Sequence, residues 1–477
     1  LYPSEGRRRE VGDAIVGLMY PHGETARIPV CAVTGTNGKT TVTRMIGHVL
    51  GASGRTVGVT TTDGIYVGGR CVAEGDTTGP QSARTVLFDP TVDVAVLETA
   101  RGGIMRRGLG YDWSDVAVLT NIQPDHFGQD GIENLDDLVY VKSLVAERVR
   151  DGGTLILNAD DEHLARLADE PRVGADRKRV VYFSLRENHL LIRRHLDAGG
   201  TAYVLRDGWA VEATPQGERR LLRVAAVPAT MYGTAEFQVA NVLAAVAAAR
   251  AMGANDEQLA ALATFRGDRD NPGRFNLFKV ASGGYVLLDY GHNPEALRAV
   301  TQMASRWEGY DVTGIVTVPG DRDDRLIREG GRIAARGFRR LVIREDDDTR
   351  GRERGEVAAM IHEAALAEAP GLDCEIILGE RESLERELER LRAGQVVVMF
   401  YDKLKTLLAV LERYGAEPVS SIEGLRARAA AGAEATAAPL VAPAYVEPSA
   451  ATPDADKTAA RTRFRDGERD AHGYAWR

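Results

Sequence analysis

Residues 28–41, with the sequence IPVCAVTGTNGKTT, most constrain the fold of this chain. The apolar, β-branched first half predicts a buried strand, and the run after it has the apolar spacing of a helix. A strand, a glycine-rich turn, a lysine, a hydroxyl and a helix, in that order, form a phosphate-binding P-loop. Glycines let backbone N–H groups approach phosphate oxygens, and the N-terminus of the helix adds partial positive charge. The segment therefore predicts a nucleotide-binding α/β domain.

Two residues of this loop carry its chemistry. Lys39 is predicted to reach the β- and γ-phosphates, and Thr40 is predicted to ligate Mg²⁺. The general pattern requires a glycine at position 33, where this chain has Val33. The alternative is an ordinary corner between a strand and a helix, with a solvated lysine. The nucleotide-binding residues predicted from the loop are Gly35, Thr36, Asn37, Gly38, Lys39, Thr40 and Thr41.

The composition is that of a globular protein with more than one domain. A length of 477 residues suggests two to four domains. The net charge of −9 predicts no affinity for nucleic acid or an anionic membrane, and no apolar run could span a bilayer. The three cysteines are far apart and lack metal-binding spacing, so we expect a reducing, cytoplasmic location. Because the chain begins with Leu1 and not with methionine, we expect it to be either a processed protein or a piece of a longer one.

Alternating strands and helices predict a mostly parallel sheet with helices on both faces. Polar residues follow the predicted strands, at the edge where such sheets bind ligands. Glu98 stands at this edge, and its carboxylate suits Mg²⁺, which prefers oxygen ligands. The alternative is a solvated glutamate at the end of a strand. The strands predicted in this part are 28–34, 57–62, 92–98, 116–120 and 154–158.

The rest of the chain divides by pattern. Short strand-like runs at about 180–227 predict a small β insertion. A segment rich in Gly, Asp, Asn and Pro at 266–274 predicts a linker. From about 419 the chain is rich in Ala, Pro and charge, which predicts disorder. A second α/β unit lies between the linker and this tail, with strands predicted at 285–289, 313–318, 340–343, 375–378 and 395–400.

Six motifs in one order resemble those of the Mur ligase superfamily, which includes the folylpolyglutamate synthases. The resemblance covers roughly residues 28–415. Within the superfamily, stretches at 98–110, 271–278, 319–324 and 344–352 are similar to the C-terminal ligase half of the cyanophycin synthetases. The six motifs are VTGTNGKTT, Glu98, TNI-x-x-DH at 120–126, LNADD at 157–161, PGRF at 272–275 and DYGHNP at 289–294.

The resemblance implies a domain order and a reaction. It divides the chain into a lead-in segment (1–27), a central ATP-binding domain that includes the β insertion (28–268), a smaller Rossmann-like domain (269–418) and a disordered tail (419–477). A carboxylate would attack the γ-phosphate of ATP to give an acyl phosphate, and an amine would then displace phosphate to form an amide. As in cyanophycin synthesis, the resemblance implies that arginine is joined to an aspartyl side-chain carboxylate.

The same resemblance assigns catalytic roles to Lys39, Glu98, His126 and Lys142. Thr40 and Glu98 would hold Mg²⁺ between them, and His126 would help to hold a second metal ion. Lys142 falls where many Mur ligases carry a carbamylated lysine, whose anionic oxygens support a hard cation. The alternatives are a structural histidine at position 126 and a surface lysine at position 142.

Further residues match nucleotide contacts of the family. Asn241 matches an asparagine that contacts adenine, although the usual H-N-x-x-N reads F-Q-V-A-N here. Arg274, Asp289 and His292 match positions that the next domain supplies to the nucleotide. Asp289 would accept a ribose hydroxyl, and Arg274 and His292 would lie near the phosphates as the domains close. Closure would exclude water from an acyl phosphate that hydrolyses easily.

Charged residues are predicted to bind the two substrates. The acidic run at 345–348, which includes Asp346, and the nearby Arg350 fall near where some Mur ligases read the incoming amino acid. The residues predicted to bind the substrate there are Asp347, Asp348 and Arg350. Because carboxylates bind guanidinium groups bidentately, this run favours arginine as the amine. Arg101 and Arg106 are predicted to hold an acidic acceptor such as an aspartyl chain. The alternatives are a solvated charge run and a surface beside the phosphates.

Two other functions remain open. One is a ligase of the same type that acts on another poly-amino-acid or a glutamylated cofactor. The other is a non-catalytic, nucleotide-binding subunit of a larger assembly. The predicted cofactors are ATP and Mg²⁺, and the predicted partners are amino-acid and carboxylate substrates, with no nucleic acid and no membrane. An ATP-grasp partner or upstream domain and a homo-oligomer are both left open.

Overall fold

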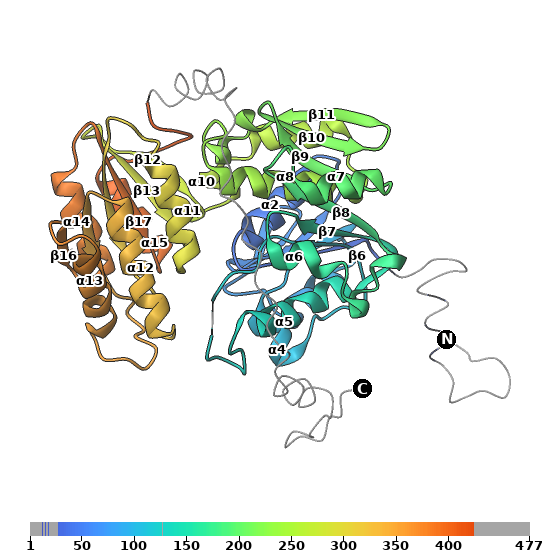
Figure 1. The fold of residues 1–477 in the computed structure, drawn as a ribbon, viewed down its shortest axis with the longest axis horizontal. Coiled ribbons are helices and arrows are strands. Elements are labelled where there is room, and N and C mark those ends of the chain that lie inside the picture. Colours follow the sequence, from blue (N-terminus) through green and yellow to red (C-terminus); the bar gives the residue numbers. More distant parts are fainter. Residues whose placement is uncertain (1–11, 13–14, 16–17, 19–26, 126, 424–477) are drawn as a thin grey trace. The chain divides into compact units, whose positions relative to one another are not determined.

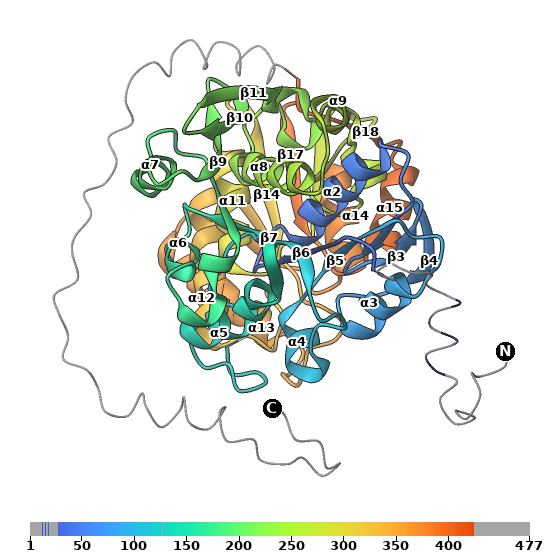
Figure 2. The same cartoon turned by 90° about the vertical axis from the view of Figure 1, so that its right-hand side faces the viewer.

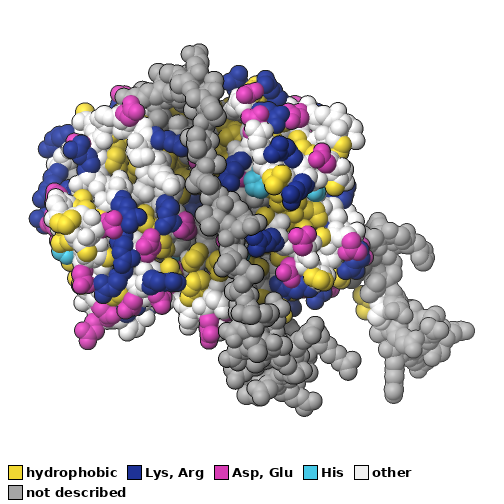
Figure 3. Space-filling model, viewed as in Figure 1, with side chains coloured by type: hydrophobic (Ala, Val, Ile, Leu, Met, Phe, Trp, Pro, Cys, Tyr) yellow, Lys and Arg dark blue, Asp and Glu magenta, His cyan; other side chains and the backbone are white. Residues whose placement is uncertain are grey.

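The structure is a computed structural model that describes residues 27–125 and 127–423, together with Gly12, Ile15 and Leu18 (Figure 1). His126, most of the predicted lead-in and the predicted tail beyond 423 lie outside the described residues. Two separate sheets form the described part. Basic and acidic side chains are interspersed on the face drawn in Figure 3. No helix of the described residues is both long enough and apolar enough to cross a bilayer.

The first sheet is mainly parallel and has eleven strands. Its strands are β1 Val30–Thr34, β2 Val57–Thr60, β3 Gly64–Val67, β4 Arg70–Glu74, β5 Val94–Glu98, β6 Ser114–Leu119, β7 Val149–Asn158, β8 Arg179–Ser184, β9 Thr201–Arg206, β10 Trp209–Thr214 and β11 Gly217–Arg223. They lie in the order β11-β10-β9-β8-β7-β6-β1-β5-β2-β3-β4. The strands from β9 to β2 run parallel, and an antiparallel hairpin extends each end. The P-loop strand β1 is therefore central.

Helices cover both faces of this sheet. The helices of this part are α2 Lys39–Gly51, α3 Pro80–Leu87, α4 Arg101–Arg107, α5 Leu135–Glu147, α6 Glu162–Leu167, α7 Leu190–Asp197, α8 Glu236–Ala251 and α9 Asp256–Ala260. Apolar residues of α2 and α8 pack on one face, and those of α4 to α7 pack on the other. Figure 2 shows α2 and α8 on one side of β5, β6 and β7, with α4 and α5 on the opposite side.

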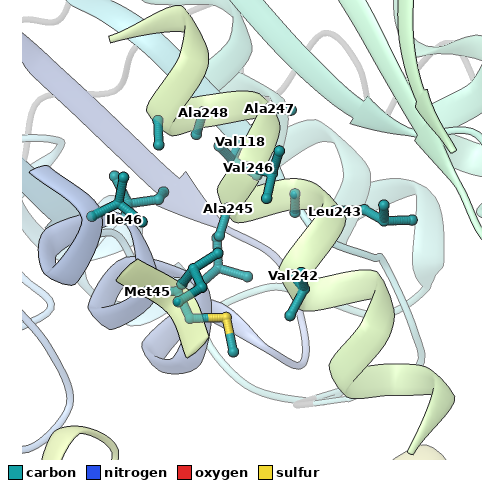
Figure 4. Close-up of a cluster of buried hydrophobic side chains, with 14 of the residues drawn as sticks. Met45, Ile46, Val118, Val242, Leu243, Ala245, Val246, Ala247 and Ala248 are labelled. Atoms are coloured by element: carbon teal, nitrogen blue, oxygen red, sulfur yellow. The ribbon is translucent and has the colours of Figure 1, made fainter. Parts of the chain in front are cut away.

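Helix α8 is buried around most of its circumference. It carries the Ala-rich run predicted as a strong helix, and its small side chains allow close approach to its neighbours. Figure 4 shows Val242 and Ala245 of α8 near Met45 of α2, with Val118 of β6 close by. Because α2 begins at the P-loop, this packing fixes the helix on which the loop depends.

The second sheet has seven strands in the order β16-β15-β14-β17-β13-β12-β18. The strands β16 to β13 in that order run parallel, and β12 and β18 are antiparallel at one edge. Helices α11, α12 and α13 pack on one face, and α14 and α15 pack on the other. Its elements are β12 Asn276–Lys279, β13 Tyr285–Asp289, α11 Pro294–Ala304, β14 Asp311–Val316, α12 Asp324–Gly337, β15 Arg340–Ile343, α13 Glu356–Glu368, β16 Asp373–Ile376, α14 Glu380–Arg390, β17 Gln395–Phe400, α15 Leu404–Arg413 and β18 Glu417–Val419.

The predicted fold class is confirmed, because two mostly parallel α/β sheets follow one another along the chain. The structure differs at 180–227, where the predicted small insertion is instead a continuation of the first sheet. There β8 and β9 extend the parallel order, and β10 and β11 complete the edge. Periodicity predicts a strand but not its neighbour, because pairing depends on contacts between distant segments. The predicted linker contains a short helix, α10 Gly267–Asp270.

Candidate functional site

A cavity of about 540 Å³ takes its lining from residues of both sheets. On the first sheet it lies at the ends of β1, β5 and β6, where the sequence predicts ligand binding. Asp347 and Asp348 are not among its lining residues, and His126 lies outside the described residues. The predicted site residues that line it are Gly35, Thr36, Asn37, Gly38, Lys39, Thr40, Thr41, Glu98, Arg101, Arg106, Lys142, Asn241, Arg274, Asp289, His292 and Arg350.

The loop between β1 and α2 requires glycine at two positions. Gly35 has φ of +147°, and an added Cβ would lie 2.0 Å from Thr120 Oγ1. Gly38 has φ of +86°, and an added Cβ would lie 2.3 Å from Asn241 Oδ1. Val33 is fully buried within β1, so the chain is still a strand where the general P-loop pattern places its first glycine. The cradle is therefore built by the turn that follows the strand.

The neighbouring strand end holds this loop in place. Asn121, which follows β6, accepts the backbone N–H groups of Thr36 and Asn37 at 2.8 Å each, through its carbonyl and its side chain. Thr120 Oγ1 donates to the Asn37 carbonyl at 2.6 Å. Lys39 Nζ donates to the Thr36 carbonyl at 2.9 Å, and burial lowers its pKa. Residues of the TNI motif, which lie beside the P-loop in the fold, thus hold that loop in its shape.

A group of oxygen ligands lies beside the loop. Thr40 Oγ1 is 3.3 Å from Thr62 Oγ1, and Thr62 Oγ1 lies 3.0 Å from Glu98 Oε1. Glu98 is only 2% exposed, and its other oxygen accepts the Thr62 N–H at 3.1 Å. Mg²⁺ prefers oxygen ligands and takes few from protein when phosphates and waters supply the rest. The group fits Mg²⁺, although the described residues contain no cluster of three His, Cys, Asp or Glu side chains suited to a metal.

Lys142 is buried next to the P-loop. It lies on α5, is 3% exposed, and donates from Nζ to Thr36 Oγ1 at 2.8 Å. Burial, and then the nearby charge of Lys39, hold its pKa well below the ordinary lysine value. Lys142 is therefore not a surface lysine, which was the alternative interpretation of this position.

We call the parts of the chain built around the first and second sheets the first and second lobes. The second lobe supplies three residues that are predicted to bind the nucleotide. The Arg274 guanidinium lies over the Tyr290 ring, with Cζ 4.3 Å from its centre. Burial raises the pKa of Asp289 to about 6, and its Oδ1 accepts the Gly291 N–H at 2.7 Å. His292 Nδ1 lies 3.0 Å from the Tyr290 carbonyl, and burial lowers the pKa of the ring.

Direct contacts join the lobes around the cavity. Asn293, the N-cap residue of α11, donates to Asn37 Oδ1 of the P-loop at 3.0 Å. Arg322 Nε donates to Asp125 Oδ1 at 2.8 Å, and both side chains are nearly inaccessible. The sequence motifs of the two lobes therefore meet at the cavity. Neither Arg322 nor Asn293 was among the predicted site residues.

The two ends of the cavity differ in character. Asn241 lies beside Phe237 and Gln238, and its Nδ2 donates to Gln238 Oε1 at 3.0 Å. Gln238 stands at one of the two positions where this chain departs from the usual motif. On the other lobe, Asp346 and Asp402 line the cavity. Asp402 is the second residue after the end of β17, at the same kind of strand end that led to the prediction of Glu98, but the sequence did not lead to its prediction.

The predicted substrate residues are only partly brought together. Arg101 pairs with Asp130 at 2.9 Å, and Arg106 lies near it on α4. Arg350 also lines the cavity and pairs with Asp321 at 2.8 Å. By contrast, the exposed side chain of Asp347 pairs with Lys403, and Asp348 Oδ1 accepts the Arg350 N–H at 3.0 Å. The roles of all these residues remain predictions.

The sequence matches the models of two domains of one known protein family. The Mur ligase middle domain matches residues 33–249, and the Mur ligase glutamate ligase domain matches residues 273–400. The chain belongs to the Mur ligase family. Each match covers most of one of the two lobes, and the predicted resemblance to this family is confirmed.

Cyanophycin synthetases are among the curated relatives of this chain. The protein of Trichormus variabilis is 40% identical over 416 residues, which cover 87% of this chain and 45% of the relative. The protein of Synechocystis is 41% identical over 413 residues, which cover 86% and 46%. The chain therefore spans less than half the length of these relatives.

Solved structures share the fold. The folylpolyglutamate synthase of Mycobacterium tuberculosis complexed with ADP has a TM-score of 0.59 at 18% identity, over 85% of this chain and 94% of that one. The E. coli FolC structure in complex with DHPP and ADP has a TM-score of 0.58 at 19% identity, over 84% and 90%. At these identities the likeness concerns the fold alone.

Proposed function

We propose that this chain catalyses ATP-dependent amide formation between a carboxylate and an amine, through an acyl phosphate. The observation that carries the proposal is one cavity where a P-loop, a group of oxygen ligands and polar residues of a second lobe meet. The 40% identity to cyanophycin synthetases favours an aspartyl side-chain carboxylate as the acceptor and arginine as the amine.

In this proposal the nucleotide lies along the P-loop. Lys39 and the loop N–H groups bind its phosphates, and the end of the cavity beside Asn241 takes adenine. Asp289 accepts a ribose hydroxyl, most strongly in its ionised form, and Arg274 and His292 face the phosphates. Polar contacts between the lobes exclude water from the acyl phosphate.

Thr40 and Glu98 would hold Mg²⁺, with Thr62 beside them. The bound ion would neutralise phosphate charge and orient the γ-phosphate for attack. The role of His126 at a second metal ion remains a prediction. Lys142 also remains a predicted catalytic residue. A lysine whose pKa is lowered is more often neutral, and the neutral amine is the form that reacts with carbon dioxide to give a carbamate.

The substrates would enter from opposite sides of the phosphates. Arg101 and Arg106 of the first lobe would hold the acidic acceptor. Arg350 would face the amino acid, together with Asp346 and Asp402, which also line the cavity. Asp347 and Asp348 do not line it. Carboxylates at this wall suit a guanidinium group.

The domain boundaries proposed here are 28–268 for the ATP-binding domain and 269–418 for the C-terminal domain, between a lead-in and a tail. An ATP-grasp half or partner would supply part of what the longer relatives contain. We also propose a cytoplasmic location and a homo-oligomer.

The test is ADP release with Mg²⁺-ATP over a grid of acceptors and amines. The acceptors are β-aspartyl chains, poly-aspartate and glutamate chains, and the amines are arginine, lysine and glutamate. ADP release that needs both an aspartyl chain and arginine, with one amide bond per ADP by mass spectrometry, would support the proposal. Lys39→Ala is the inactive control, and Lys405→Ala, a highly exposed lysine, is the matched control.

Each other outcome has a defined meaning. Release with a different pair would keep the ligase chemistry and replace the substrates. No release with any pair, while nucleotide still binds, would favour a non-catalytic subunit of a larger assembly.

A further inference from the structure

We propose that Asp63 is a positioning residue that holds the Arg274 guanidinium at the phosphate end of the cavity. The inference rests on the proposed function, because it takes Arg274 as a ligand of the nucleotide. Asp63 lies between β2 and β3, does not line the cavity, and belongs to none of the six family motifs.

The backbone at Arg274 is fixed by the second lobe. Gly273 has φ of +74°, and an added Cβ would lie 1.8 Å from Tyr401 Oη, which donates to the Gly273 carbonyl at 2.9 Å. Phe275 is buried with φ of +61°. The Cα of Arg274 is therefore held, and its long side chain is the part that needs a partner.

The nitrogen atoms of the Arg274 guanidinium differ in whether they have a partner. One face lies on the Tyr290 ring, and Nη2 is 3.5 Å from Asp63 Oδ1. Nε is buried and has no hydrogen-bond partner among the described residues. Since a buried N–H without a partner is costly, this atom is a donor that a ligand could satisfy. The charge of Arg274 also contributes to the lowered pKa of Lys39, so the two cations lie near each other.

Asp63 is itself anchored from the P-loop helix. Arg44 of α2 places Nη2 3.2 Å from Asp63 Oδ2, and the same nitrogen donates to Tyr66 Oη at 3.0 Å. Each oxygen of Asp63 thus faces a different arginine. One arginine belongs to the helix of the phosphate loop, and the other to the segment that enters the second lobe.

This arrangement aligns Arg274 without neutralising it. Two guanidinium groups share one carboxylate, so net positive charge remains for a polyphosphate. Without the carboxylate, the two like charges would repel each other and Arg274 would lose its alignment. Removing a negative charge would by itself strengthen the binding of an anion. Weaker binding would therefore report the loss of positioning and not the change in net charge.

The experiment measures ADP binding in the presence of Mg²⁺ by isothermal titration calorimetry. The proteins are the full chain and its variants Asp63→Asn, Arg274→Gln and the double variant. We expect Asp63→Asn to weaken ADP binding about fivefold, the effect of one modest ion pair. The double variant should bind no more weakly than Arg274→Gln, because Asp63 acts through Arg274.

Asp207→Asn is the matched control, since Asp207 pairs with Arg220 on the exposed surface. Asp63→Glu, which keeps the charge and moves the carboxylate, is a second variant and should also weaken binding. Unchanged or tighter binding in both Asp63 variants, or additive losses in the double variant, would overturn the inference. Absence of ADP binding to the unmodified chain would instead refute the proposed function and the inference with it.

Discussion

At the scale of single residues, burial changes what a side chain can do. Lys142, Asp289 and His292 all line the cavity, and burial shifts the pKa of each toward its neutral form. Near neutral pH an ordinary lysine is charged, whereas Lys142 is shifted toward the free amine. A lysine exposed on the surface would not be shifted toward the free amine in this way.

For Lys142 we expect carbamylation to be directly visible. The low pKa and the neighbouring Thr36 hydroxyl favour a neutral amine that captures carbon dioxide. With ¹³C-labelled bicarbonate, the unmodified chain should show a carbamate signal by NMR that Lys142→Arg lacks. Arginine retains the positive charge and should also reduce ADP release about 100-fold. Identical spectra for the two proteins would rule out this role.

For Asp289 we expect a pH-dependent cost to stability. Its folded pKa of about 6 lies above the unfolded value, so the folded state binds more protons between those values. The stability that this group contributes is therefore present at low pH and is lost as pH rises through 6. At pH 7.5, Asp289→Asn should be more stable by about 1–2 kcal/mol in urea unfolding, although it binds nucleotide less well. An equal difference between the two proteins at pH 4.5 and pH 7.5 would contradict this.

At the scale of elements, the P-loop depends on the end of another strand and on a second helix. The loop between β1 and α2 is held by residues after β6, and α8 both packs on α2 and supplies Asn241 beside Gly38. Its shape is therefore decided by segments far apart in the chain.

We expect Gly35→Ala to abolish nucleotide binding while the fold remains. The added methyl group would lie 2.0 Å from Thr120 Oγ1, in a loop held on that side by β6. Gly54→Ala is the matched control, because Gly54 also has positive φ but nothing lies within 4 Å of its added Cβ. Both variants should lose about 1 kcal/mol from backbone strain, and only Gly35→Ala should lose ADP binding by calorimetry. Equal ADP affinities in the two variants would contradict the steric argument.

At the scale of the whole described chain, the site exists only where the lobes meet. The Arg322–Asp125 pair joins the loop after β14 to the end of the TNI-x-x-DH motif, and it is almost fully buried. Buried pairs give little net stability, but removing one partner is costly because the charge of the other stays buried.

We therefore expect Arg322→Met to destabilise the protein by about 3 kcal/mol, because Asp125 would remain charged and buried. Arg322→Met combined with Asp125→Asn should recover much of this loss. The measurement is the midpoint of thermal unfolding, and Arg339→Met, which breaks an exposed pair with Asp311, is the control. A double variant no more stable than Arg322→Met would contradict this account.

Local patterns in the amino-acid sequence predict the two α/β units, most of their strands and the P-loop. Those features depend on local periodicity and on residues adjacent in the chain, and three predicted strands, at 285–289, 340–343 and 395–400, match the observed bounds. The motif order also sufficed to identify the family.

Features that depend on contacts between distant segments come only from the folded structure. It extended the first sheet with the segment at 180–227, placed Asp346 and Asp402 in the cavity in preference to Asp347 and Asp348, and brought Asp63 to Arg274. A local pattern specifies the type of an element and the face on which its side chains lie. Which elements become neighbours, and which charges become buried, is settled only when the whole core packs.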